Sequence, residues 1–208
     1  MNAFAGRAGN QGTLLTTWAG GAEMSTATRV AAMFLIAVAT AVGAQISVPL
    51  GFTPVPLVMG DMVVLLGGAA LGSRLGMAAQ VLYLAAGIAG LPVFAASATL
   101  PQGPLRMLGP TGGYLMAYPI AAYLTGYLAE RGFDRRYVTS VLAMAVGYVA
   151  IFTFGVSWLA LFAWPAGIGF DAALRAGLYP FMLGGLCKLL LGAGVLPGVW
   201  KLIGRAGA

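Results

Sequence analysis

Long stretches of apolar sequence without charge are the feature that most constrains this chain. No charged residue occurs from Val30 to Gly60. In the whole chain only 8% of residues are charged, whereas soluble domains carry about a quarter. So little polar surface could not cover the core of a soluble protein, and the mean hydropathy is +0.92. We therefore expect an all-α membrane protein with one compact domain in the lipid bilayer.

Proline and glycine divide the apolar sequence into six predicted transmembrane helices. We expect them at about residues 28–47, 58–71, 75–90, 112–130, 136–162 and 174–203. The second is short for a full span of about 20 residues, so it is expected to tilt or to begin below the membrane surface. Residues 1–24 are rich in Gly and Ala and lack the apolar core of a signal peptide. We expect a disordered extension at 1–24 and a six-helix transmembrane domain over 25–208.

Basic residues orient the predicted bundle. With six spans, the termini and two of the interhelical connections share one side, which carries Arg7, Arg29, Arg74, Arg131, Arg135, Arg136, Lys201 and Arg205. The other side carries only Arg106 and Arg175. An excess of Lys and Arg marks the cytoplasmic side. We therefore expect a multi-pass protein of the cell inner membrane with both termini in the cytoplasm.

The composition also excludes several functions. The chain has no histidine, which excludes histidine metal ligands and histidine bases, and it has no GxxxxGK[ST] phosphate loop. The net charge of +6 does not indicate nucleic acid, because the basic residues are scattered among apolar runs. We expect no metal, no cofactor and no catalytic residue. Active transport would need ATP hydrolysis by another chain, or an ion gradient.

Two ionisable residues fall inside predicted helices. Lys188 has twelve uncharged residues on each side, which places it near the middle of the last helix. A lysine at that depth costs several kcal/mol unless it is paired or hydrated, so it indicates a functional site. Asp61, near the outer end of the second helix, could pair with Lys188 or line the same polar cavity. The alternatives are snorkelling of Lys188 and stabilisation of a helix N-terminus by Asp61.

The two longest outward loops, 48–57 and 91–111, are apolar and rich in Pro and Gly. Stiff loops of this kind indicate a lid over a site, although ordinary interhelical turns are the alternative. Arg106 could bind an anion at the mouth of that site or be a solvated loop charge. On the first helix, small residues that include Ala37 and Ala41 could dock a partner helix or pack internally.

Several motifs resemble the BioY family, in the right order over about residues 28–200. They are Phe52-Thr53-Pro54-Val55-Pro56, Gly72-Ser73-Arg74-Leu75-Gly76, Gly90-Leu91-Pro92-Val93-Phe94-Ala95, Gly109-Pro110-Thr111-Gly112-Gly113-Tyr114-Leu115, Gly155-Val156-Ser157-Trp158-Leu159 and Pro180-Phe181-Met182-Leu183-Gly184. GPTGGYL after GLPVF is the most specific of these patterns.

The resemblance implies a biotin-uptake protein, the substrate-capture (S) component of an energy-coupling-factor transporter, and not an enzyme. It implies a six-helix bundle whose outward pocket is capped by the 1–2 and 3–4 loops. The implied partners are a membrane coupling protein, docked by small residues that Ala37 and Ala41 resemble, and cytoplasmic ATPase subunits. The pocket would hold biotin among Thr53, Val55, Asp61, Phe94, Arg106, Thr111, Tyr114, Trp158 and Lys188. An interfacial aromatic belt is the alternative role for Trp158.

One departure from the family pattern concerns an acidic residue. The family usually has Gly-Asp-x-x-Lys in the last helix, whereas this chain has Gly185 where the Asp is expected and keeps Lys188. Asp61 adds a carboxylate on the second helix instead. We hypothesise that Asp61 replaces the lost acid, accepting hydrogen bonds from a ureido N–H and balancing Lys188.

Three rival interpretations stay open. The chain could be a paralogue that captures a different vitamin-like ligand, or a membrane-embedded enzyme that uses Asp61 and Lys188 as an acid–base pair. It could also be a helix-packing scaffold without a ligand.

Overall fold

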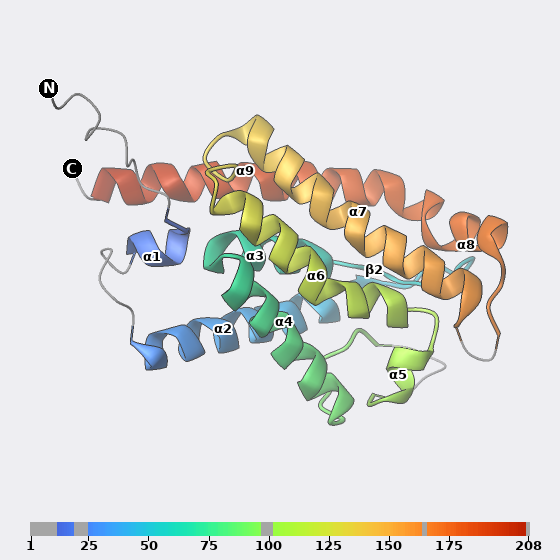
Figure 1. The fold of residues 1–208 in the computed structure, drawn as a ribbon. Coiled ribbons are helices and arrows are strands. Elements are labelled where there is room, and N and C mark those ends of the chain that lie inside the picture. The colour runs from blue at the N-terminus through green and yellow to red at the C-terminus, as the bar shows by residue number, and fades with distance from the viewer. Residues whose placement is uncertain (1–11, 19–24, 97–101, 164–165, 207–208) are drawn as a thin grey trace, which may run out of the picture.

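The computed structural model describes residues 12–18, 25–96, 102–163 and 166–206, and helices dominate them (Figure 1). The elements in chain order are α1 (Leu14–Trp18), α2 (Thr26–Gln45), β1 (Ser47–Val48), β2 (Leu57–Val58), α3 (Gly60–Leu71), α4 (Ser73–Ile88), α5 (Leu105–Leu108), α6 (Gly112–Ala129), α7 (Tyr137–Leu161), α8 (Phe170–Gly177), the 3-10 turn η1 (Tyr179–Phe181) and α9 (Met182–Ala206).

The six predicted helices correspond to α2, α3, α4, α6, α7 and α9, which form a bundle. The prediction was wrong about the start of the last one, which was expected at 174. The chain instead forms the separate helix α8, turns through η1, and begins α9 at Met182. Pro180 explains the break, because its ring removes a backbone donor and disfavours a helical residue before it.

The expected all-α architecture needs one small correction in the loop between α2 and α3. β1 and β2 form an antiparallel pair in which Ser47 faces Val58 and Val48 faces Leu57. Pro49, Pro54 and Pro56 lie between the two strands, where their missing N–H groups do not interrupt the pairing. The loop is therefore a closed hairpin whose ends are fixed beside α2 and α3.

Three stretches of the described chain are long and apolar enough to cross a membrane: Thr26–Gln45, Tyr137–Leu161 and Phe170–Leu202. The chain is therefore a membrane protein by this criterion, with α2, α7 and α9 as its clearest spans. α3 has only 12 residues, which agrees with the prediction of a short second helix. The six-span topology stays a prediction.

Glycines bring three helices of the bundle into backbone contact. A Cβ added to Gly68 of α3 would lie 2.4 Å from the Ala122 carbonyl oxygen of α6, and one added to Gly76 of α4 would lie 2.7 Å from the Gly68 Cα. On α6, a Cβ at Gly126 would lie 2.5 Å from the Gly72 carbonyl carbon. Small residues permit such close crossings in membranes, where dispersion contacts hold helices together.

Residues 12–18, which lie in the part of the chain expected to be a disordered extension, include the short helix α1. α1 inserts Leu14 among Ala69, Ala129 and Leu196 at the ends of three longer helices, because this apolar side chain gains contacts there that solvent would not provide. The rest of the predicted extension, 1–11 and 19–24, lies outside the described residues.

The bundle has two chemically different ends (Figure 1). α1 marks one end, where α2 begins, α3 meets α4, α6 meets α7 and α9 finishes; α5 and α8 mark the other. The α1 end carries the described basic residues that the sequence places on one side, which are Arg29, Arg74, Arg131, Arg135, Arg136 and Lys201. It is also held by a hydrogen bond of 2.6 Å from the Trp200 indole nitrogen to the buried Asp134 carboxylate.

The glycine contact predicts a position-specific effect on stability. Gly68→Ala should lower the free energy of unfolding by roughly 1–3 kcal/mol, because backbone atoms of α6 occupy the space that the new methyl group needs. The thermal unfolding midpoint of the purified protein should fall accordingly. Gly198→Ala on α9 is the matched control, since nothing lies within 4 Å of its added Cβ. An equal shift for the two variants would contradict the close crossing.

Candidate functional site

A cavity of about 290 Å³ lies at the end of the bundle opposite α1. Its walls come from the β1–β2 hairpin, the segment after α4, α5, and the facing parts of α3, α4, α6, α7 and α9. Eight of the nine predicted ligand residues line it: Thr53, Val55, Asp61, Phe94, Arg106, Thr111, Tyr114 and Lys188. The fold thus brings together residues that are more than 130 positions apart in the sequence.

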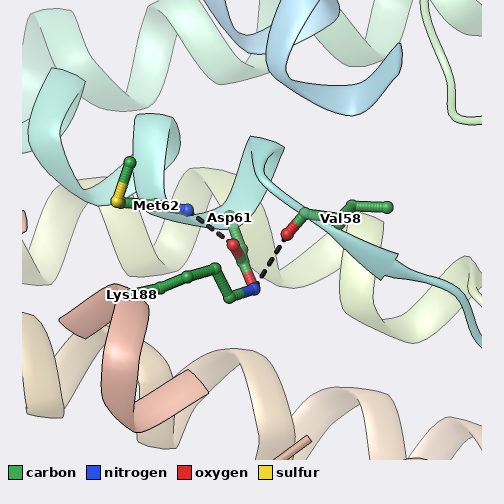
Figure 2. A network of polar contacts seen from close by, with 4 residues as sticks. All are labelled: Val58, Asp61, Met62 and Lys188. Carbon is green, nitrogen blue, oxygen red and sulfur yellow. Dashed lines mark hydrogen bonds and ion pairs between the residues drawn. The ribbon is translucent and has the colours of Figure 1, made fainter. Parts of the chain in front are cut away.

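A buried ion pair forms the most polar part of the cavity wall (Figure 2). The Lys188 Nζ lies 2.5 Å from Asp61 Oδ2 and donates a second hydrogen bond of 2.8 Å to the Val58 carbonyl oxygen. Asp61 is 8% exposed and Lys188 is 6% exposed. Lys188 therefore does not snorkel to the surface, and the predicted pairing with Asp61 is confirmed.

The positions of the two charges follow from local structure. Asp61 lies in the first turn of α3, where its Oδ1 accepts a hydrogen bond of 2.7 Å from the Met62 amide and where the helix dipole favours a carboxylate. Val58 precedes that turn as the end of β2, so the hairpin presents its carbonyl to the same ammonium. One lysine thereby joins α9, α3 and the hairpin.

Aromatic walls of the cavity rest on glycines of neighbouring helices. The Phe94 ring lies where a Cβ of Gly87 would be, 2.1 Å away, and it makes an edge contact with Tyr83 at a centroid distance of 5.5 Å. The Tyr114 ring likewise occupies the space above Gly155. Each ring fits because the facing residue is glycine and has no side chain, which gives a physical reason for glycine at these two positions.

Two hydroxyl groups on α6 face the cavity without a protein partner among the described residues. Thr111 is the N-cap residue of α6, yet its side chain does not cap the helix. Tyr118 lines the cavity about two turns further along α6 and is stacked on Tyr83 at a centroid distance of 6.1 Å. By contrast, the Tyr114 hydroxyl already donates to the Gly177 carbonyl at 2.8 Å. Thr111 and Tyr118 are therefore the hydroxyls available to a ligand.

Two further polar residues of the loops that line the cavity, Thr53 and Arg106, act within the protein. Thr53 donates to the Ala176 carbonyl at 2.5 Å and accepts from the Val55 amide at 3.2 Å, which fastens the hairpin to α8. Arg106 is buried and donates to the Ala95 carbonyl. Burial lowers the pKa of its guanidinium, which stays protonated at neutral pH. Both loops are thus tied down over the cavity.

Three predicted residues lie away from the cavity. Trp158 does not line it; its indole donates to the Gly109 carbonyl at 3.0 Å and its side chain packs on Gly113, so it fixes the turn that presents Thr111. Ala37, predicted to dock a partner, is only 7% exposed, and Ala41 packs against the same core. Both alanines therefore contribute to internal packing of α2, the alternative that the sequence left open.

The sequence did not single out Tyr83, Tyr118 or Phe152, which also line the cavity. Their sequence signal is weak, because an aromatic residue on an apolar helix is equally consistent with lipid contact. Only the packing of α4, α6 and α7 turns these rings inward.

Gly185, where the family pattern has an acid, faces a different space. It lines an apolar groove between α7, α8 and α9, and Phe152 separates this groove from the ligand cavity by lining both. A Cβ at 185 would meet the Phe152 ring at 3.7 Å. The carboxylate that meets Lys188 therefore comes from α3 and not from α9.

Comparisons with known proteins give a consistent result. The family model described as "BioY family" matches residues 15–205. A "Probable biotin transporter BioY" of Pyrococcus horikoshii is 39% identical over 162 residues, covering 78% of this chain and 90% of its own length. A "Biotin transporter BioY" of Rhizobium etli is 33% identical, covering 88% of this chain and all of its own.

The fold also matches a solved structure. The S-component for biotin from an ECF-type ABC transporter superposes with a TM-score of 0.72 at 22% identity. The match covers 86% of this chain and 95% of that chain. At this identity the likeness shows the fold, and the extended coverage shows that the fold is shared almost from end to end.

The ion pair predicts strong coupling between Asp61 and Lys188. Removing one partner, in Asp61→Asn or Lys188→Met, leaves a buried charge and should destabilise the protein by roughly 3–5 kcal/mol. The double variant should be more stable than the sum of the two single effects predicts, because it buries no unpaired charge. Thermal unfolding of the four proteins measures the coupling; additive losses would show that the two charges act independently.

Proposed function

The chain belongs to the BioY family, and from this premise we propose that it takes up biotin as the substrate-capture subunit of an ECF transporter. The observation that carries the proposal is the cavity with the Asp61–Lys188 pair in its wall. Mostly apolar walls with a few convergent polar groups are what small-molecule sites require. Biotin has this character, since an apolar fused ring system carries a polar ureido group and a carboxylate tail.

The ureido group of biotin suits the Asp61–Lys188 pair. The Asp61 carboxylate can accept from a ureido N–H, and Lys188 can donate to the ureido oxygen, so both partners keep charge-assisted contacts when the ligand enters. The charge of Lys188 is already balanced by Asp61 at 2.5 Å. We therefore place a neutral ligand group here and not the carboxylate.

The carboxylate of biotin suits the opposite part of the cavity. Thr111 offers an unused hydroxyl at the N-terminus of α6, where the helix dipole favours an anion. Arg106 lines the cavity from α5 and contributes a positive charge. Phe94 and Tyr114 would pack against the rings between the two polar ends.

Topology and partners follow from the same premise. We infer that α2, α3, α4, α6, α7 and α9 span the inner membrane, that the basic α1 end faces the cytoplasm, and that the cavity opens outward. A membrane coupling protein and cytoplasmic ATPase subunits would supply the energy. Because Ala37 and Ala41 pack against the core, a coupling protein that docks on α2 would meet exposed apolar residues such as Phe34, Leu35 and Val38.

The rival interpretations receive less support. The relatives are named as transporters, which favours transport over acid–base catalysis by Asp61 and Lys188. The cavity argues against a scaffold without a ligand. A paralogue with a different vitamin-like ligand is the second candidate, and Gly185 in place of the family's acid is the observation that favours it.

Calorimetric titration of the purified protein tests the proposal directly. We expect tight binding of biotin, weaker binding of desthiobiotin, which lacks the sulfur-containing ring, and no binding of unrelated vitamins. Tight binding of another vitamin, with none of biotin, would favour the paralogue. Binding of none of these compounds would refute the proposed function.

The assigned polar contacts predict graded losses of affinity. Thr111→Val removes the unused hydroxyl and should weaken biotin binding several-fold, the value of one neutral hydrogen bond, whereas Thr111→Ser should retain it. Asp61→Asn removes a charge-assisted acceptor and should weaken binding by about 10- to 100-fold. Affinity unchanged within about twofold in Asp61→Asn would exclude the ureido contact.

A further inference from the structure

One stretch of backbone in the cavity wall is held by side chains from four places in the chain. This wall segment, Pro92–Ala95, follows α4 and carries Phe94 into the cavity. Its carbonyl groups accept hydrogen bonds from Gln45, Tyr83, Gln102 and Arg106. The segment has no helical or strand hydrogen bonds of its own, so these side chains determine its position.

Gln45 makes the largest share of these contacts. It is the last residue of α2, and its amide nitrogen lies 3.4 Å from the Pro92 carbonyl oxygen, 3.3 Å from that of Val93 and 3.2 Å from that of Phe94. The same nitrogen lies 3.3 Å from the Ala41 carbonyl oxygen within α2. An amide has two N–H donors, so it shares them among these four acceptors.

Among the four donors, Gln45 alone comes from α2. Tyr83 belongs to α4, which runs directly into the wall segment, and Gln102 and Arg106 belong to the chain just after it. Gln45 instead fastens the segment to a helix that is distant in sequence.

α2 is the least buried of the three clear membrane spans. Only 22% of its span is buried, against 44% for α7 and 39% for the stretch that contains α9. It lies at the edge of the bundle against α3 and α4 (Figure 1). Its C-terminal end also leads into β1, and the Ile46 carbonyl accepts from the Met59 amide at 3.0 Å. The end of α2 thus contacts both segments that cover the cavity.

We propose that Gln45 is a positioning residue that keeps the cavity closed by fastening the wall segment Pro92–Ala95 to the end of α2. Movement of α2 away from α3 and α4 would withdraw the amide from three carbonyl groups at once. The wall segment and Phe94 would then be free to leave the ligand. This role of Gln45 in the release of ligand rests on the proposed function, whereas its hold on the wall segment does not.

Two variants and one control test the proposal. Gln45→Leu has nearly the same volume without any donor, and Gln45→Glu keeps the length and polarity but offers only acceptors at neutral pH. Val42→Ala is the matched control, because Val42 is exposed three residues before Gln45 on α2 and has no hydrogen-bonding side chain. Hydrogen exchange of the ligand-free proteins and the dissociation rate of biotin are measured for each.

We expect the Val93 amide, which donates to the Leu91 carbonyl at 2.8 Å, to exchange several-fold faster in both Gln45 variants, because without the Gln45 contacts the wall segment opens more often. Biotin should dissociate faster by a similar factor, while its association rate does not fall and the unfolding midpoint matches that of Val42→Ala. A merely structural role would instead accelerate exchange throughout the bundle.

Exchange of the Val93 amide that is unchanged in both variants, or acceleration spread over the whole bundle, would overturn the proposal. Failure of the wild-type protein to bind biotin would refute the proposed function instead, and the exchange of the ligand-free variants would still decide the role of Gln45.

Discussion

The ion pair between Asp61 and Lys188 is the interaction on which the rest of the site depends. Each charge alone would cost several kcal/mol at this depth, so the two are retained only because they meet. Their contact requires α3 and α9 to lie side by side with the β1–β2 hairpin closed, since Lys188 also donates to Val58. The pair therefore sets the relative position of two helices and a loop, and its cavity side remains available to a ligand.

The cavity around this pair exists because backbones approach closely elsewhere. Gly68, Gly76 and Gly126 let α3, α4 and α6 cross in contact at the α1 end, and Gly87 and Gly155 make room for Phe94 and Tyr114 at the other. The same small residue thus closes one end of the bundle and shapes the open end. The role of each glycine depends on whether a helix backbone or an aromatic ring lies against it.

An element could be predicted from the sequence where neighbouring residues determine it, and could not where a distant helix does. Proline and glycine placed the ends of most helices within a few residues, because breaking a helix is a local effect. The break before α9 was missed although Pro180 marks it, since the apolar run continues through it. The burial of Leu14 and of Ala37 could not be predicted, because each depends on which neighbouring helix arrives at that position. Trp158 was predicted to contact the ligand but does not line the cavity, for the same reason. A tryptophan that faces a ligand and one that packs under a turn have the same local sequence pattern.

The sequence by itself determined that this chain is an apolar helical membrane protein, which of its ends is basic, and that a lysine and an aspartate lie within apolar helices. These properties depend on composition and on spacing along a single helix. Only the tertiary structure decided that the two charges meet, that Gly185 faces a separate groove, and that Gln45 reaches the wall segment after α4. The ion pair and the Gln45 contacts join residues 47 or more positions apart, and their geometry is set by helix packing, which no local pattern specifies.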